Sequence, residues 1–154
     1  MTAQVGAPAP DFSLPADGGE TITLSALRGK HVVLYFYPKD DTPGCTTEAK
    51  DFTAMAEEFK AAGAVVIGMS RDTATKHDKF IAKHDLKVKL AADVDGSATE
   101  AYGVWVEKNM YGRTYMGIER ATYLIDDKGV VRQVWRKVRV KGHAQAVLDA
   151  VKAL

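Results

Sequence analysis

The sequence predicts an α/β fold in which a mixed β-sheet lies between helices. Two nearly continuous apolar and β-prone runs, 32–37 and 64–69, are separated by a helical pattern, which is the order of a right-handed β-α-β unit. Two later runs, 121–125 and 130–135, are joined by an Asp-Asp-Lys-Gly turn and are typical of an antiparallel hairpin. A sheet with both kinds of pairing buries its faces under helices.

A second hairpin is predicted at the N-terminus. Two short alternating stretches, 11–15 and 20–24, surround an Asp-Gly-Gly turn signal at 17–19. The chain has 154 residues, of which 46% are hydrophobic, so it can bury one core without disulfides. We therefore expect a single domain over residues 1–154.

Three helices are predicted from apolar residues at helical spacing. The first has its core face at positions 52, 55, 56 and 59 and stops at Gly63. The second runs from about residue 73 to 84, ahead of a short strand at 88–91, and the third starts at His143. This order of elements is that of the thioredoxin-like fold, although other α/β layouts share it.

Charge and composition exclude several classes of partner. The 21 Lys and Arg residues balance 20 Asp and Glu residues, and the two signs are interspersed, so nucleic acid is not expected. No apolar run reaches the ~18 residues of a membrane span, and the first twelve residues show no signal peptide. The four histidines are scattered and lack the spacing of a metal site, so no metal is expected. The sequence also has no nucleotide-binding motif, so no cofactor is expected. An unpaired thiol persists in a reducing compartment, so we expect a cytoplasmic protein.

The only cysteine, Cys45, lies where several local rules meet. Thr42 is a good N-cap for a helix that follows the strand ending at Tyr37, and Pro43 fits the first helical position. Cys45 then falls in the first turn, where its sulfur faces free backbone N–H groups and the positive end of the helix dipole. A lone cysteine is more often an inert buried side chain, but this placement favours a reactive thiolate.

A reactive thiolate also needs groups that stabilise the charge developing on the atom it attacks. Thr42 supplies a hydroxyl from the same turn. Spacing alone does not decide which basic residue stabilises this charge, because four of them lie at strand ends or in loops. These are Lys39, Arg71, Arg113 and Arg120. Arginine is preferred because its planar fork holds two acceptors at once, and Arg120 directly precedes a predicted strand.

At this point the sequence resembles a known family. Pro38, Thr42 and Cys45 match the P-x-x-x-T-x-x-C signature of the peroxiredoxins. The similarity extends from about Ala7 to the C-terminus and is strongest to the peroxiredoxin Q subgroup, also called bacterioferritin comigratory protein. The stretches that carry it are 35–46 with Glu48, 103–105 and 117–126.

The resemblance implies a thioredoxin fold with an N-terminal hairpin and a thiol-dependent peroxidase acting on hydrogen peroxide and organic hydroperoxides. It implies that Cys45 is the peroxidatic thiolate and Arg120 its charge partner. Thr42 would donate a hydrogen bond to the peroxide, and Pro38 would shield the site from water. The backbone N–H groups of Gly44 and Cys45 would complete the peroxide pocket.

One departure from the subgroup concerns the resolving cysteine. Many members carry it five residues after the peroxidatic one, where this chain has Lys50, and others carry it in the following helix, where 73–84 contains none. We therefore expect a one-cysteine, monomeric enzyme whose sulfenic acid is reduced by an external thiol such as thioredoxin, glutaredoxin or glutathione. Glu48 is a weaker site candidate, since an acidic residue near a helix N-terminus is favourable in any case.

Two other functions stay open on the sequence alone. Oxidation of Cys45 could change a partner contact in a non-enzymatic redox sensor or a thiol-dependent chaperone. A glutathione-dependent thiol transferase usually needs a cis-proline opposite its cysteine, and residues 120–122 contain no proline.

An aromatic-rich connection precedes Arg120 and contains Trp105, Tyr111, Tyr115 and Met116. Ordinary packing of a long loop explains it most simply. The functional alternative is a rim of the peroxide pocket or a docking surface for the reductant.

Overall fold

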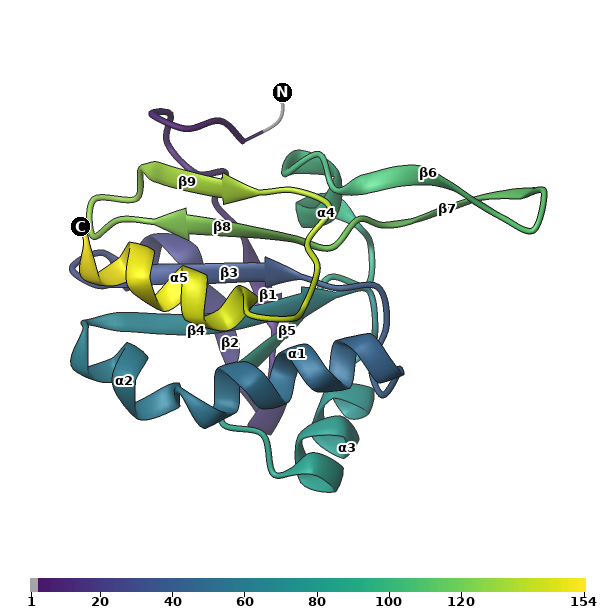
Figure 1. Ribbon diagram of the computed structural model, residues 1–154, viewed down its shortest axis with the longest axis horizontal. Helices are drawn as coiled ribbons and strands as arrows, with labels where there is room; N and C mark the ends of the chain where they lie inside the picture. The colour runs from purple at the N-terminus through teal and green to yellow at the C-terminus, as the bar shows by residue number, and fades with distance from the viewer. Residues whose placement is uncertain (1–2) are drawn as a thin grey trace.

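The computed structural model describes residues 3–154 and is built on a five-stranded mixed sheet (Figure 1). The strands are β3 (His31–Phe36), β4 (Ala64–Ser70), β5 (Lys89–Ala92), β8 (Ala121–Ile125) and β9 (Val131–Trp135). Their order is β5-β4-β3-β8-β9, with β3, β4 and β5 parallel and β8 and β9 antiparallel to their neighbours. The predicted mixed sheet is confirmed.

Helices and the N-terminal segment cover the two faces of this sheet. The helices are α1 (Pro43–Ala54), α2 (Ala56–Ala61), α3 (Ala74–His84), α4 (Ser97–Ala101) and α5 (His143–Lys152). α1, α2 and α5 lie over one face, where Phe52, Phe59 and Val147 are buried (Figure 1). The other face is covered by the predicted N-terminal hairpin, β1 (Ser13–Pro15) and β2 (Thr21–Thr23), and by Tyr102 after α4.

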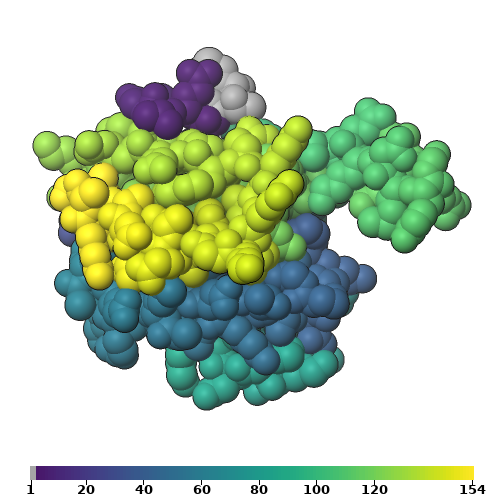
Figure 2. Space-filling model, viewed as in Figure 1, coloured from purple at the N-terminus to yellow at the C-terminus, as the bar shows by residue number. Residues whose placement is uncertain are grey.

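Two segments differ from the sequence prediction. The helix expected from its core face at 52–59 is broken at Met55, whose N–H bonds to the Phe52 carbonyl in an i to i−3 turn. The aromatic-rich connection is an antiparallel hairpin, β6 (Trp105–Met110) and β7 (Arg113–Ile118), and not a loop. This hairpin projects from the body of the molecule (Figure 2), at the end of the sheet where β3 ends.

Sheet pairing gathers several chain segments at that same end. Phe36, the last residue of β3, pairs with Met69 near the end of β4 and with Ala121 at the start of β8. Met69 in turn pairs with Ala91 of β5. The segments that follow β3, β4 and β5 therefore leave the sheet at the same end at which the chain enters β8. Among the described residues no helix is long and apolar enough to cross a membrane.

Candidate active site

Cys45 lies in the first turn of α1, as predicted. The helix begins at Pro43 with Thr42 at the N-cap position, and no side chain caps it. Thr46 N–H donates to the Thr42 carbonyl, whereas the N–H groups of Gly44 and Cys45 have no acceptor within residues 3–154. Only 2% of Cys45 is exposed. The sulfur is therefore sheltered, and two backbone donors at the helix start remain available to a ligand.

The Thr42 hydroxyl is oriented by its own loop. Oγ1 donates to the Lys39 carbonyl oxygen at 2.8 Å, and Thr42 is half-buried. A hydroxyl has one proton and two lone pairs, so this bond leaves only acceptor capacity for a ligand. While this bond is made, Thr42 can only accept a hydrogen bond from a ligand, and the donor role that the resemblance implies would require its hydroxyl to turn away from Lys39.

Arg120 reaches the sulfur because β8 runs antiparallel to β3. Its first residue, Ala121, lies beside Phe36, which places Arg120 next to the segment that leads into α1. Arg120 Nη2 lies 3.3 Å from Cys45 Sγ, within hydrogen-bond reach. A Cβ atom on Gly44 would come within 3.1 Å of Arg120 Nη2, so a glycine at this position admits the guanidinium. A fixed cation at this distance is placed to stabilise negative charge on or beside the sulfur.

The other basic candidates are engaged or remote. The Arg71 guanidinium carbon lies 3.4 Å from the centroid of the Trp105 ring, and its Nε donates to Thr99. Arg113 is exposed at the start of β7, and Lys39 is exposed on the loop. Of the four cations that the spacing left open, Arg120 is the one that contacts the sulfur.

Glu48 anchors Arg120. Its Oε1 accepts from Arg120 Nη1 at 2.7 Å, and Glu48 lies one helical turn after Cys45 with 1% of its surface exposed. Burial raises the pKa of Glu48 to about 7, although the charge of Arg120 opposes this shift. Its second oxygen, Oε2, has no hydrogen-bond partner among the described residues. The guanidinium thus acts as a fork, with Nη1 bound to Glu48 and Nη2 bound to Cys45. We call this arrangement the Arg120 fork.

Pro38 begins the loop that leads to this centre, and Lys108 interacts with its charges. Pro38 directly follows the last buried residue of the β3 segment and is exposed. Lys108 comes from β6, and burial, followed by the positive charge of Arg120, lowers the pKa of this lysine. The middle of the β6–β7 hairpin therefore lies within electrostatic reach of the site. The tip does not pack against the body, since Tyr111 is 97% exposed.

His143 was not singled out as a site residue from the sequence, although it contacts both α1 and β8. Its ring packs edge-on against Phe52, and its Nε2 is hydrogen-bonded to Thr122 at 2.7 Å. Burial and then the charge of Arg120 lower the pKa of His143 to about 4, so the ring is neutral at physiological pH. No group of three or more His, Cys, Asp or Glu side chains in residues 3–154 is arranged to hold a metal ion.

Comparison with known proteins matches this geometry to a family. The model of the AhpC/TSA family matches residues 5–134. The chain belongs to this family. Peroxiredoxin Bcp of Bacillus subtilis is 50% identical over 99% of this chain and 97% of its own length. A structure of Xanthomonas campestris peroxiredoxin Q is 48% identical, covers 99% of this chain and 98% of its own, and has a TM-score of 0.91.

A second solved structure, a cysteine-to-serine mutant of PrxQ from Xylella fastidiosa, is 38% identical and has a TM-score of 0.94. It covers 99% of this chain and 98% of its own. The chain is therefore a peroxiredoxin of the Q or Bcp type, a thiol-dependent peroxidase with a thioredoxin-like fold. A peroxide is its substrate and a thiol its reductant. No finding supports the sensor or chaperone alternative.

Replacing Glu48 with Gln is expected to slow the reaction of Cys45 with peroxide only at neutral and alkaline pH. Below pH ~6 Glu48 is protonated in the wild-type protein and resembles Gln, so both react equally with peroxide. Near pH ~8 the variant keeps only a neutral hydrogen bond to Arg120 and is expected to react several-fold more slowly. Stopped-flow measurement of the reaction of Cys45 with peroxide across this range checks the prediction.

The same substitution is expected to raise the free energy of unfolding, although it lowers the reaction rate. The folded-state pKa of Glu48 lies above its unfolded value, so its contribution to stability is lost as the pH rises through about 7. Glu48→Gln does not ionise, and its free energy of unfolding is expected to exceed that of the wild type above this pH. A variant that is both slower and less stable at every pH would show that Glu48 has a packing role only.

Proposed function

We propose that Cys45 reduces hydrogen peroxide and organic hydroperoxides through a sulfenic acid that an external thiol regenerates. The observation that carries this proposal is the Arg120 fork, with Nη2 at 3.3 Å from Cys45 Sγ and Nη1 at 2.7 Å from Glu48 Oε1. It fixes a permanent positive charge beside a thiol that has no disulfide partner in the chain.

The chemical step is a displacement at oxygen. The Cys45 thiolate attacks one peroxide oxygen, a new S–O bond forms, and the O–O bond breaks. The electron pair leaves with the second oxygen, which takes up a proton to become an alcohol or water, and the sulfur becomes a sulfenic acid. Negative charge moves from sulfur to oxygen during this step, so preorganised donors contribute most in the transition state.

Arg120, two backbone N–H groups and Thr42 are assigned to this step, and Pro38 to the entrance of the site. Arg120 stabilises the thiolate and then the developing oxyanion, and the free N–H groups of Gly44 and Cys45 bind the peroxide oxygens. Thr42 accepts a hydrogen bond from the protonated oxygen of the bound peroxide, because its own hydroxyl proton is donated to the Lys39 carbonyl. Pro38 shields the entrance from water, which its exposed position before the loop permits.

Regeneration requires thiols from outside the chain. One thiol attacks the sulfenic sulfur, releases water and forms a mixed disulfide, and a second thiol restores Cys45. Lys50 occupies the position where many relatives have a resolving cysteine, which supports this scheme. Thioredoxin, glutaredoxin or glutathione would serve as the reductant. We further assign the chain to one monomeric domain, residues 1–154, in the reducing cytoplasm, where a buried free thiol persists.

Organic hydroperoxides are included on two grounds. A structural study of the Xanthomonas campestris relative, 48% identical to this chain, is devoted to alkyl peroxide reduction. The site of this chain also has apolar neighbours, since Cys45 belongs to the buried cluster that contains Tyr35 and Phe52.

The test is turnover of hydrogen peroxide and an alkyl hydroperoxide with a small thiol, a glutaredoxin system and a thioredoxin system. We expect catalytic consumption of both peroxides with at least one donor and rates proportional to enzyme concentration. Oxidation of Cys45 without turnover by any of the donors would instead favour the redox-sensor function.

A further inference from the structure

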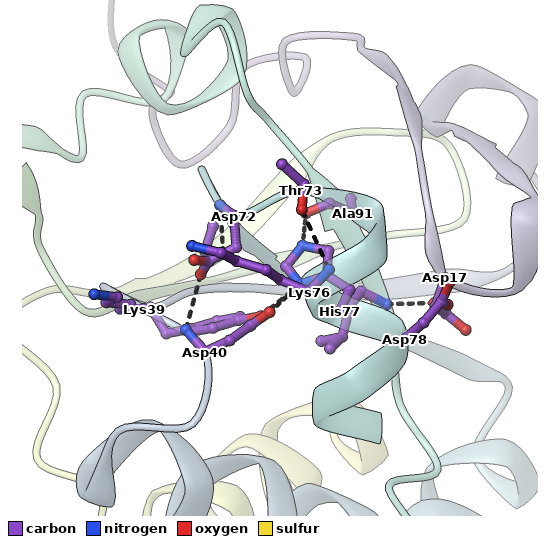
Figure 3. A network of polar contacts seen from close by, with 12 residues as sticks. Asp17, Lys39, Asp40, Asp72, Thr73, Lys76, His77, Asp78 and Ala91 are labelled. Carbon is purple, nitrogen blue, oxygen red and sulfur yellow. Dashed lines mark hydrogen bonds and ion pairs between the residues drawn. The ribbon is translucent and has the colours of Figure 1, made fainter. Parts of the chain in front are cut away.

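A buried polar cluster joins the loop before Cys45 to α3. Asp40 Oδ2 lies 2.6 Å from His77 Nδ1, and His77 Nε2 lies 2.9 Å from the Ala91 carbonyl oxygen (Figure 3). Tyr37 Oη donates to the other carboxylate oxygen of Asp40 at 2.5 Å. His77 is completely buried, and Asp40 is 9% exposed. We call Asp40, His77 and the Ala91 carbonyl the loop clamp.

The partners of His77 determine its protonation. A carbonyl oxygen only accepts hydrogen bonds, so Nε2 must donate to Ala91. A second proton must lie between Nδ1 and the Asp40 carboxylate, and it stays on the ring because imidazole is a stronger base than a carboxylate. His77 is therefore a doubly protonated imidazolium inside the protein. A neutral ring has one N–H for two acceptors, so one acceptor would face a lone pair at hydrogen-bond distance.

Sheet topology explains why these groups meet. Asp40 follows β3, His77 comes from the helix after β4, and Ala91 lies in β5, so the clamp spans three parallel neighbours at one sheet end. The Asp40 backbone is also held, because its N–H donates to Asp72 Oδ2 at 2.8 Å. Residues 38–42 thus run from a fixed strand, through Asp40, directly to the N-cap of α1.

We propose that His77 is a positioning residue for the peroxidase reaction, which as a buried imidazolium holds loop 38–42 so that Thr42 and the first N–H groups of α1 are set against Cys45. This inference rests on the proposed roles of Thr42, Gly44 and Cys45. Loss of the His77 proton breaks one of its two bonds, so Asp40 is held only by Tyr37 and by its backbone bond to Asp72, and Thr42 can shift relative to the sulfur. Peroxide attack, which needs that geometry, then slows more than simple alkylation of the thiol.

The electrostatic surroundings of His77 support this assignment. Burial alone would lower the pKa of His77, but the hydrogen bond and charge of Asp40, the Ala91 carbonyl and the charge of Asp72 raise it above its ordinary value. Tyr37 faces Nδ1 at 3.5 Å as a neutral phenol, and Lys76 and Asp78 flank His77 on α3 (Figure 3). Because the folded-state pKa is raised, the clamp is complete at low pH and is lost as the pH rises above about 6.5 and through that pKa.

A second tether between the same loop and α3 lies on the surface. Asp41 accepts from Lys83 Nζ at 2.7 Å and from His84 Nε2 at 2.8 Å. Asp41 adopts a positive φ of 60°, a conformation that non-glycine residues rarely hold without support. Since the Lys83 and Asp41 side chains are 61% and 43% exposed, this pair is screened by solvent, and the buried clamp is the stronger constraint.

The test compares His77→Gln with His31→Gln. Glutamine carries one donor end and one acceptor end, like neutral imidazole, so His77→Gln imitates the deprotonated clamp at every pH. His31 is a half-buried histidine at the opposite end of β3, so the same substitution there is a matched control. For each protein we would measure the rate of Cys45 oxidation by hydrogen peroxide and its rate of alkylation by iodoacetamide between pH ~6 and ~9. Their ratio cancels the thiolate fraction.

Relative to the ratio in His77→Gln, the ratio in the wild type and in His31→Gln is expected to fall as the pH rises through the His77 titration, because the ionisation of Glu48 is common to all three proteins. In His77→Gln it is expected to be about tenfold or more below the wild-type value near neutral pH, and insensitive to that titration. An unchanged ratio, or equal loss of both rates, would overturn the positioning role. A wild-type protein whose Cys45 does not react with peroxide would contradict the proposed function instead.

A measurement on the unmodified protein keeps the inference testable if His77→Gln does not fold. Nitrogen NMR of ¹⁵N-labelled histidine rings should show both ring nitrogens of His77 protonated at neutral pH, with titration above the ordinary histidine range. A neutral His77 ring at neutral pH would contradict the clamp.

Discussion

Cys45→Ser is expected to abolish peroxide reduction with every thiol donor. The hydroxyl of serine does not ionise at physiological pH, so no nucleophile remains at the helix start. Serine is close to cysteine in size, and Cys45 contributes one small side chain to the buried cluster around Phe52. The variant should therefore keep its fold, which circular dichroism and thermal unfolding would establish.

The Cys45→Ser variant tests whether Cys45 is the residue that reacts with peroxide. Cys45 is the only cysteine in the chain, so no other thiol can take over its role. Thiol-dependent turnover above the uncatalysed rate in a folded Cys45→Ser protein would mean that another residue reacts with peroxide, and the site described above would then be wrong.

Arg120→Ala is expected to reduce the rate of peroxide attack by about 30- to 1,000-fold, the range for a lost transition-state donor of about 2–4 kcal/mol. The substitution removes the contact from Nη2 to Cys45 Sγ and leaves Glu48 buried without its partner. Arg120→Lys keeps a charge but not the fork, so an intermediate rate is expected. Stopped-flow kinetics with hydrogen peroxide measures all three proteins.

Two controls belong with this prediction. Arg113→Ala removes an exposed arginine of the hairpin that the sequence had left as a candidate, and wild-type kinetics are expected. Arg120→Ala/Glu48→Gln removes the unpaired carboxylate, which separates loss of the catalytic charge from the cost of a buried orphan charge. If Arg120→Ala reacted at the wild-type rate, a different cation would serve Cys45.

The position of Cys45 could be predicted because it depends on local rules. Thr42 at the N-cap and Pro43 at the first helical position lie within three residues of the sulfur, and α1 begins where they indicate. The strands of the main sheet were likewise predicted from runs of adjacent residues. The β6–β7 hairpin turns at Tyr111 and Gly112, which both have positive φ, but a tyrosine at this position gives no sequence signal for such a turn.

The partners of Cys45 depend on contacts that no local pattern encodes. Spacing alone left four cations open and the family resemblance implied Arg120, but its contact with the sulfur depends on the pairing of β8 beside β3. Glu48 gains its importance from Arg120 and not from the helix N-terminus, so its role was underestimated. Asp40 and His77 carried no sequence signal at all, because they are separated by 37 residues and meet only through the parallel order of the strands.

The most direct measurement of the one-cysteine mechanism is the intact mass of the reduced protein after one equivalent of hydrogen peroxide in the absence of thiol. We predict a monomer heavier by one oxygen atom, located on Cys45, that returns to its starting mass when a small thiol is added. Further peroxide should drive the same residue to the sulfinic acid, because the chain holds no second cysteine to capture the sulfenic acid. A spectrum dominated by a Cys45-to-Cys45 disulfide dimer, or an unchanged mass while peroxide is consumed, would contradict this mechanism.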